Sequence, residues 1–211
     1  MKINLDSPVI VFLTTVADFM ILNILFILCC APVITIGPAV SALYTITMRE
    51  ARHEGGYIFK PFFKAFKNNF KQAFLLSILY LIIGASFVFG VKFWIEKPEF
   101  STVNQVILVI TGVFAVIFIF SLLYVFALIA RFDNTIFKTV KNAVILAVFN
   151  LRETFLLTLI HVIVIVLMIF TKGIWIFMMV GGFSVCAYIN SLLFIRVFRQ
   201  YEKIEGGNHD D

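Results

Sequence analysis

Long apolar tracts run through almost the whole chain and are interrupted by short segments in which lysine, arginine and phenylalanine cluster. The 211 residues are 62% hydrophobic and only 14% charged, whereas soluble domains are roughly 45–50% apolar and about 25% charged. A soluble core of this size cannot bury that apolar excess, so lipid is the expected solvent. Because apolar runs of about 18 or more residues are candidate membrane-spanning helices, the sequence predicts an all-α membrane protein.

We expect a six-span helical bundle that forms a single domain over residues 1–201, followed by a polar cytoplasmic tail over residues 202–211. A cleaved signal peptide is not expected, because the first apolar tract is too long for a signal core and contains Asp18. The three cysteines, two of them adjacent, are expected to be free. The six spans are expected near residues 8–30, 33–48, 73–95, 103–130, 154–171 and 173–195.

The basic residues fall mainly on one side of the predicted membrane. If the N-terminus is cytoplasmic, 14 of the 17 lysines and arginines lie inside, and only Lys92, Lys97 and Lys172 lie outside. Cytoplasmic loops are the ones enriched in lysine and arginine. We therefore expect both termini in the cytoplasm. The net charge of +5 then reflects topology and contact with anionic lipid headgroups, and nucleic acid is not an expected partner.

Two segments on the inner side have the pattern of interfacial amphipathic helices. In the first, lysines recur at helical spacing beside a stripe of phenylalanines, so the rings would enter the lipid and the lysines would face the phosphates. Docking of this face on a partner is the alternative. The second, near residues 137–151, places two lysines beside an apolar face. The lysines of the two segments are Lys60, Lys64, Lys67, Lys71, Lys138 and Lys141.

A parallel internal repeat is a further expectation. Residues 69–77 (NFKQAFLLS) align with residues 150–158 (NLRETFLLT) at an offset of 81 positions. Both segments enter the membrane from the cytoplasm in the predicted topology, so the repeat would be parallel rather than inverted. Chance matching between apolar segments is the alternative explanation.

Polar residues inside the first two spans are the candidate intramembrane site. A carboxylate near the centre of a spanning helix costs roughly 2.5–3.5 kcal/mol on insertion scales, so Asp18 is expected to face the bundle interior or a wet cavity. Asn23 lies on a related helix face. The break after residue 31 contributes Thr35, Gly37 and Pro38. The alternative is that the polar groups only bond neighbouring helices.

At the cytoplasmic side, Arg49 with Glu50 and Arg131 with Asp133 end corresponding spans of the two repeats. Exposed ion pairs contribute little to stability, so partner recognition is the expected role of these residues. The sequence contains no phosphate-binding loop, zinc-protease motif, nucleophile elbow or paired-cysteine motif. We therefore expect no enzymatic activity, no cofactor and no metal.

Three stretches carry a resemblance to a known family: Asn23, the segment PVITIGPAVSA from Pro32 to Ala42, and the segment FFKAFKNNFKQ from Phe62 to Gln72. In these the chain resembles the YesL-like family of bacterial integral membrane proteins, whose activity is unassigned. The resemblance implies a bacterial cytoplasmic membrane protein. It also implies a genetic setting beside carbohydrate ABC importers, glycan-degrading enzymes and sensor kinases of Gram-positive bacteria.

These observations lead to two functional hypotheses. The first is a non-enzymatic accessory component of a carbohydrate ABC importer or of its sensing system, with ABC permease subunits or a sensor kinase as partners. The alternative is a small stand-alone solute transporter or channel. The two differ at Asp18. A transporter that uses this carboxylate would lose flux on Asp18→Asn, whereas an accessory subunit would tolerate the change because an amide can still bond a neighbouring helix.

Overall fold

The computed structural model describes residues 8–96 and 102–206, and the elements in these ranges are all helical. Lys97, which we expect on the outer side, and the end of the polar tail from residue 207 lie outside the described residues. The elements are α1 (Pro8–Cys30), the 3-10 turn η1 (Val33–Thr35), α2 (Ile36–Ala51), α3 (Phe59–Ile95), α4 (Thr102–Arg131), α5 (Ile136–Phe149), α6 (Leu151–Phe170), α7 (Lys172–Phe177), the π-helical turn η2 (Met178–Gly182) and α8 (Phe183–Gly206).

Five helical segments are long and apolar enough to cross a membrane. The predicted span near residues 33–48 corresponds to η1 and α2, and α2 has only 16 residues. At 1.5 Å per residue α2 is about 24 Å long, which is short of a hydrocarbon layer of about 30 Å. The expected count of six spans is therefore not confirmed. The five segments are Phe12–Cys30, Phe59–Ile95, Thr102–Arg131, Leu151–Phe170 and Lys172–Glu202.

The short helix α2 is the centre of the fold. It packs against α1, α3, α4 and α8, and ten of its sixteen residues are buried. Small side chains make this close packing possible. At Gly37, a Cβ atom would lie only 1.9 Å from Oγ of Ser77 and 2.7 Å from Cε1 of Phe126, so a residue larger than glycine does not fit between α2, α3 and α4.

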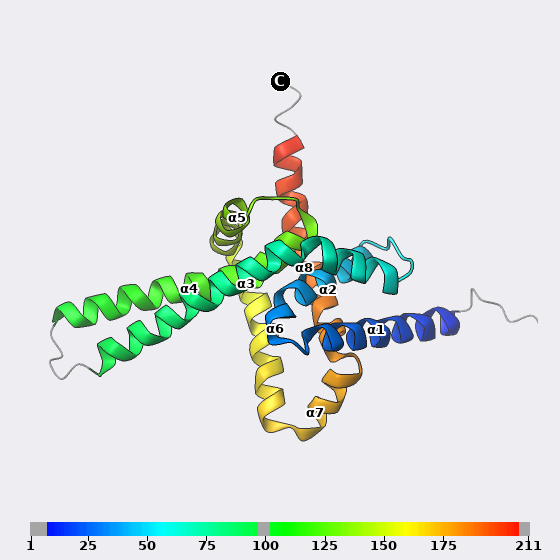
Figure 1. Cartoon of the computed structure of the whole chain (residues 1–211), viewed down its shortest axis with the longest axis horizontal. Coiled ribbons are helices and arrows are strands. Elements are labelled where there is room, and N and C mark those ends of the chain that lie inside the picture. Colours follow the sequence, from blue (N-terminus) through cyan, green and yellow to red (C-terminus); the bar gives the residue numbers. More distant parts are fainter. Residues whose placement is uncertain (1–7, 97–101, 207–211) are drawn as a thin grey trace, which may run out of the picture.

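The other helices extend from this centre as separate arms (Figure 1). α1 points to one side, the antiparallel α3–α4 hairpin points to the opposite side, and α6 with α7 forms a third arm. The outer part of each arm has few neighbours in the chain, as Phe89 in α3 and Val109 in α4 illustrate with exposed fractions of 73% and 66%. The arrangement is thus more open than the bundle that we expected, and lipid or partner helices must cover the arms.

The first predicted interfacial helix is not a separate element. Its lysines lie on the N-terminal part of α3, which continues without a break for 37 residues, or about 55 Å. Phe62 and Ala65 are buried in the core that includes α2, whereas Phe59 and Phe63 stay exposed. The expected helix end is missing: no glycine or proline lies between the phenylalanine stripe and the apolar tract, and the helix continues through Asn69.

The second predicted interfacial helix is a distinct element, α5. The Thr135 side chain caps its first turn by accepting a hydrogen bond from the backbone N–H of Lys138. The buried residues Thr139, Ala143 and Leu146 lie on α5, which packs against α4, while Phe137 remains 79% exposed. This exposure is compatible with the expected interfacial position, in which the Phe137 ring enters the lipid.

Candidate functional site

The amide of Asn23 lies at the π-helical turn between α7 and α8. Its Nδ2 atom donates to the carbonyl oxygens of Met178 (2.9 Å) and Met179 (2.8 Å). Its Oδ1 atom accepts a hydrogen bond from the backbone N–H of Ser184 (3.1 Å). A π-helical turn widens the backbone spacing, and the fully buried Asn23 side chain supplies the hydrogen bonds that these backbone groups need. Asn23 therefore fastens α1 to the last span.

The candidates at the break after α1 have local structural roles. The Thr35 hydroxyl lies 2.5 Å from the Cys29 carbonyl and 2.6 Å from the Pro32 carbonyl, so it satisfies backbone groups that the end of α1 leaves free. Gly37 and Pro38 are buried at the start of α2. None of these three residues hydrogen-bonds to Asn23 among the described contacts. The expected polar site built from all of them is not assembled.

Asp18 lies on the surface of α1, not in the interior. Its side chain is exposed, and no described residue forms a hydrogen bond or ion pair with it. We expected Asp18 to face the bundle interior, and this expectation is wrong for the chain by itself. The physical reason is the rotation of α1: the ring of the next residue, Phe19, contacts the Tyr188 ring of α8 at 5.3 Å, whereas Asp18, one position round the helix, stays exposed.

The C-terminal ends of α2, α4 and α8 meet at one end of the fold, and arginines gather there. Arg52, Arg131, Arg199 and Glu202 line one small cavity of about 40 Å³. Arg131 donates two hydrogen bonds to one carboxylate oxygen of Glu202, with its Nε and Nη2 atoms 3.0 Å and 2.8 Å from Oε1. Arg131 therefore pairs with a carboxylate that α8 supplies, and not with the nearby Asp133, among the described ion pairs.

The ion pair expected at the end of α2 is long. Nη2 of Arg49 lies 3.7 Å from the Glu50 carboxylate and donates a hydrogen bond of 2.9 Å to the Tyr57 carbonyl. Arg49 thus holds the loop between α2 and α3. The six predicted contact lysines are exposed on α3 and α5, where anionic headgroups or a partner can reach them.

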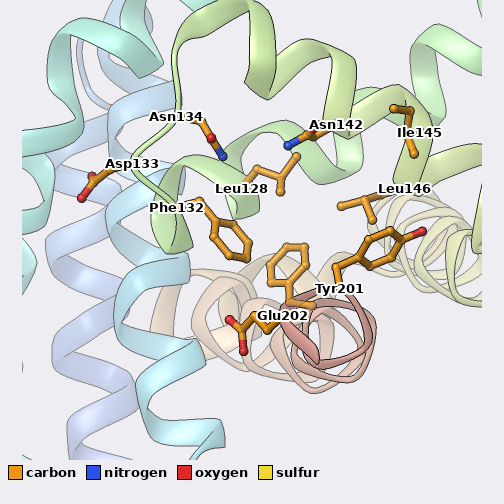
Figure 2. A pocket seen from close by; sticks show the side chains of 10 residues that line it. Leu128, Phe132, Asp133, Asn134, Asn142, Ile145, Leu146, Tyr201 and Glu202 are labelled. Carbon is orange, nitrogen blue, oxygen red and sulfur yellow. The ribbon is translucent and has the colours of Figure 1, made fainter. Parts of the chain in front are cut away.

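A larger cavity, of about 240 Å³, opens beside this arginine cluster between α4, α5 and α8 (Figure 2). The amides of Asn134 and Asn142 point into the gap between them, with Phe132 below (Figure 2). The Phe132 ring contacts the Phe198 ring edge to face at 5.3 Å. We call this cavity the inner pocket. Its lining residues are Leu128, Phe132, Asp133, Asn134, Asn142, Ile145, Leu146, Phe198, Tyr201 and Glu202.

The neighbouring helices fix the shape of the inner pocket. Gln72 of α3 donates from Nε2 to the Asn134 carbonyl (2.9 Å) and to the Thr139 hydroxyl (3.0 Å), so it holds both the loop after α4 and the start of α5. On the opposite side, Nδ2 of Asn150 donates to the Tyr201 hydroxyl (3.2 Å). The pocket therefore combines a preformed aromatic floor with amide and carboxylate groups at its edge, a composition suited to a ligand or peptide segment.

Most residues of the inner pocket were not predicted as site residues. Asn134, Asn142, Tyr201 and Glu202 come from three separate segments, and only their approach in space makes them a site. The spacing of Phe194, Phe198 and Tyr201 places these side chains along one face of α8, and this was the available signal. Among the described residues no group of three histidine, cysteine, aspartate or glutamate side chains is placed to hold a metal ion.

Residues 19–91 match the family described as "Protein of unknown function, DUF624". This match covers about a third of the chain: the C-terminal part of α1, the central helix α2 and most of α3. It is compatible with the YesL-like resemblance, and the matched family is one of uncharacterised proteins. Neither the curated proteins nor the solved structures contain a significant match to the chain.

Proposed function

We propose that this chain is a non-enzymatic accessory membrane protein that binds a partner protein through the inner pocket. The observation that carries the proposal is the location of the available polar groups. Deep in the helices, Asn23, Thr47 and Thr154 are buried and already bonded to neighbouring segments. The inner pocket, by contrast, presents amide and carboxylate groups together with aromatic surface at an accessible end of the fold.

The shape of the chain supports this role. Its spanning arms carry extended apolar faces with few neighbours in the chain, and such faces can receive the helices of a larger membrane assembly. The arginine cluster beside the inner pocket adds a charged rim, and charged rims steer association with a partner of complementary charge.

We also propose that the inner pocket faces the cytoplasm and that both termini lie on that side. The proposal rests on the basic residues at the ends of α2, α4 and α8, since Arg52, Arg131 and Arg199 line one cavity. Positive charge on one side of a membrane protein is typical of its cytoplasmic face. In this topology η1 and α2 together carry the chain from the outer end of α1 back to the cytoplasmic side.

The parallel repeat is a further part of the proposal, and matching positions in the two copies support it. Leu76 and Leu157, 81 positions apart, both have exposed fractions of 0%. The hydroxyl groups of Ser77 and Thr158, at the same offset, each donate to the carbonyl four residues before, at 2.8 Å. The copies differ at their asparagines, because α3 continues through Asn69, whereas the second copy breaks between α5 and α6 at Asn150.

For the partner we propose a permease subunit of a carbohydrate ABC importer, with an associated sensor kinase as the other member of the same system. This choice is supported by the YesL-like resemblance and the genetic setting that it implies. A helix on the cytoplasmic side of a permease can supply both an apolar side chain for the aromatic floor and polar groups for the pocket edge.

The experiment is co-purification of the chain with tagged permease subunits encoded in the same genome, after co-expression and extraction in mild detergent. The variant Asn142→Trp fills the inner pocket with a bulky ring, and Asn68→Trp on the exposed surface of α3 is the matched control. We expect Asn142→Trp to abolish the complex and Asn68→Trp to retain it. If the purified chain alone moves solute across liposomes, the alternative of a stand-alone transporter or channel replaces the accessory role.

A further inference from the structure

We propose that the face of α1 that carries Asp18 docks a membrane-spanning helix of a different protein, and that this helix bears a lysine or arginine at the level of Asp18. The inference rests on the proposed accessory role and deepens it, because it specifies the chemistry of an intramembrane contact with the partner. The observation that carries it is the position of the Asp18 carboxylate. It is exposed, has no partner among the described residues, and lies on the side of α1 that packs into the core further along the helix.

The position of Asp18 on the helix defines this face. Residues at i, i+4 and i+7 share one side of a helix, so Asp18 is in line with Leu22 and Leu25. These two leucines have exposed fractions of 1% and 6% and belong to the central core. The side of α1 that packs against the rest of the chain therefore continues through Asp18, which the helices of the chain leave exposed although the adjacent Phe19 still contacts Tyr188 of α8.

The part of this face that no other helix of the chain covers carries polar side chains. Thr14 lies one turn before Asp18, is exposed, and donates its hydroxyl to the Ile10 carbonyl (3.0 Å). Small hydroxyl residues allow close helix approach and are enriched at helix contacts in membranes, whereas lipid-facing surfaces favour apolar side chains. A carboxylate facing hydrocarbon without a partner is strongly unfavourable. Both features indicate that protein, and not lipid, covers this face.

Charge complementarity indicates which kind of helix binds the Asp18 face of α1. An acidic side chain within a span pairs with a basic one from another helix, and that basic residue must lie within the membrane. The five candidate spans of this chain contain no lysine or arginine in residues 12–30, 73–91, 103–130, 153–171 or 173–195. The titratable base in these segments is His161, which is half-buried and whose Nδ1 atom bonds the Leu157 carbonyl at 2.8 Å. A second copy therefore supplies no lysine or arginine at this level, and the partner is another protein.

The test uses the full chain in lipid nanodiscs and a defined probe. The probe is a synthetic leucine-rich spanning peptide with one central lysine, and the control peptide carries glutamine at that position. Binding is measured by energy transfer between a fluorescent protein fused to the chain and a dye on the peptide. We expect the lysine peptide to bind about tenfold more tightly than the glutamine peptide, as for one good interhelical contact. Asp18→Asn should remove this preference, and Glu96→Gln, which neutralises an exposed carboxylate at the end of α3, should retain it.

A charge exchange makes the test independent of any general damage to α1. The Asp18→Lys variant should bind a peptide with a central aspartate and reject the lysine peptide. Equal binding of both peptides by the unmodified chain, or an unchanged preference in Asp18→Asn, would overturn the inference. It would also be overturned if Asp18→Asn lowered self-association of the chain alone. These results leave the inner pocket untouched, so they are distinguishable from a failure of Asn142→Trp to disrupt the complex with the permease.

Discussion

Asn23 and Ser184 each satisfy a backbone group on the helix of the other. The Asn23 Oδ1 atom accepts from the Ser184 N–H at 3.1 Å, and the Ser184 hydroxyl lies 2.8 Å from the carbonyl of Phe19, one turn before Asn23 on α1. Helix association inside lipid gains little from burying apolar surface and depends more on packing and polar contacts. This reciprocal contact therefore fixes where α1 meets the last span and sets the direction in which the N-terminal half of α1 extends.

Replacement of Asn23 by leucine should destabilise the fold, because it keeps the branched shape of the side chain and removes all three hydrogen bonds. The carbonyls of Met178 and Met179 and the N–H of Ser184 would then lack a side-chain partner in a buried site. Each interhelical hydrogen bond in a membrane protein contributes about 0.6–2 kcal/mol, so we expect a total loss of about 2–4 kcal/mol. Reversible unfolding in mixed micelles measures this loss.

The matched control is Asn68→Leu, which removes an exposed asparagine from α3. Surface substitutions of this kind usually change stability by less than about 0.5 kcal/mol. A similar loss for both variants would mean that Asn23 does not hold the π-helical turn in solution.

The contrast between Asn23 and Asp18 indicates what the sequence can and cannot predict. A polar residue in an apolar tract has to find a partner, so both were recognised as special from the sequence. Asn23 bonds another helix within the chain, as one of the alternatives proposed. Asp18 is exposed although the adjacent Phe19 packs on α8. Its exposure depends on the rotation and crossing direction of α1, which apolar periodicity does not encode.

The helix boundaries, like these two residues, could be predicted only in part from the sequence. The first span was placed at residues 8–30, and α1 has those bounds, because the proline at its start and the break after Cys30 are local signals. The continuity of α3 through the lysine stripe was missed, since an amphipathic and an apolar segment can join in one helix. The inner pocket was missed for a different reason: α4, α5 and α8 supply its residues, and their contact is purely tertiary.

Enlarging Gly37 should disturb the centre of the fold. In Gly37→Ala the new methyl group would lie 1.9 Å from the Ser77 hydroxyl and 3.0 Å from the Ala73 carbonyl, so α2 and α3 must move apart. Overpacking of this kind costs about 1–3 kcal/mol, and we expect a lower midpoint of unfolding. Gly112→Ala is the control, because its Cβ meets no atom within 4 Å and the change favours the helix by up to about 1 kcal/mol. Equal midpoints for the two variants would contradict the close packing of α2.

Neutralising the lysine stripe of α3 should weaken its contact with anionic lipid. The four side chains of Lys60, Lys64, Lys67 and Lys71 are exposed along one helix, and each basic residue near an anionic surface contributes about 1 kcal/mol at moderate ionic strength. In the quadruple glutamine variant, we expect fewer anionic lipids to remain bound in native mass spectrometry. Glutamine at Lys92 and Lys172 is the control at the predicted outer end. If lipid retention is unchanged while the permease complex is lost, the stripe binds the partner instead.

Cysteine labelling in intact cells tests the orientation directly. In a background without Cys29, Cys30 and Cys186, single cysteines are placed at Thr171, in the exposed turn between α6 and α7, and at Glu54, in the exposed loop after α2. The two positions lie at opposite ends of the proposed topology, so a membrane-impermeant maleimide should modify Thr171→Cys in intact cells and Glu54→Cys only after permeabilisation. A cysteine at Asn134, which lines the inner pocket, should behave like the one at Glu54. Labelling of Glu54→Cys and Asn134→Cys without permeabilisation would place the arginine cluster outside the cell, and the inner pocket would then be unable to meet a cytoplasmic helix of a permease.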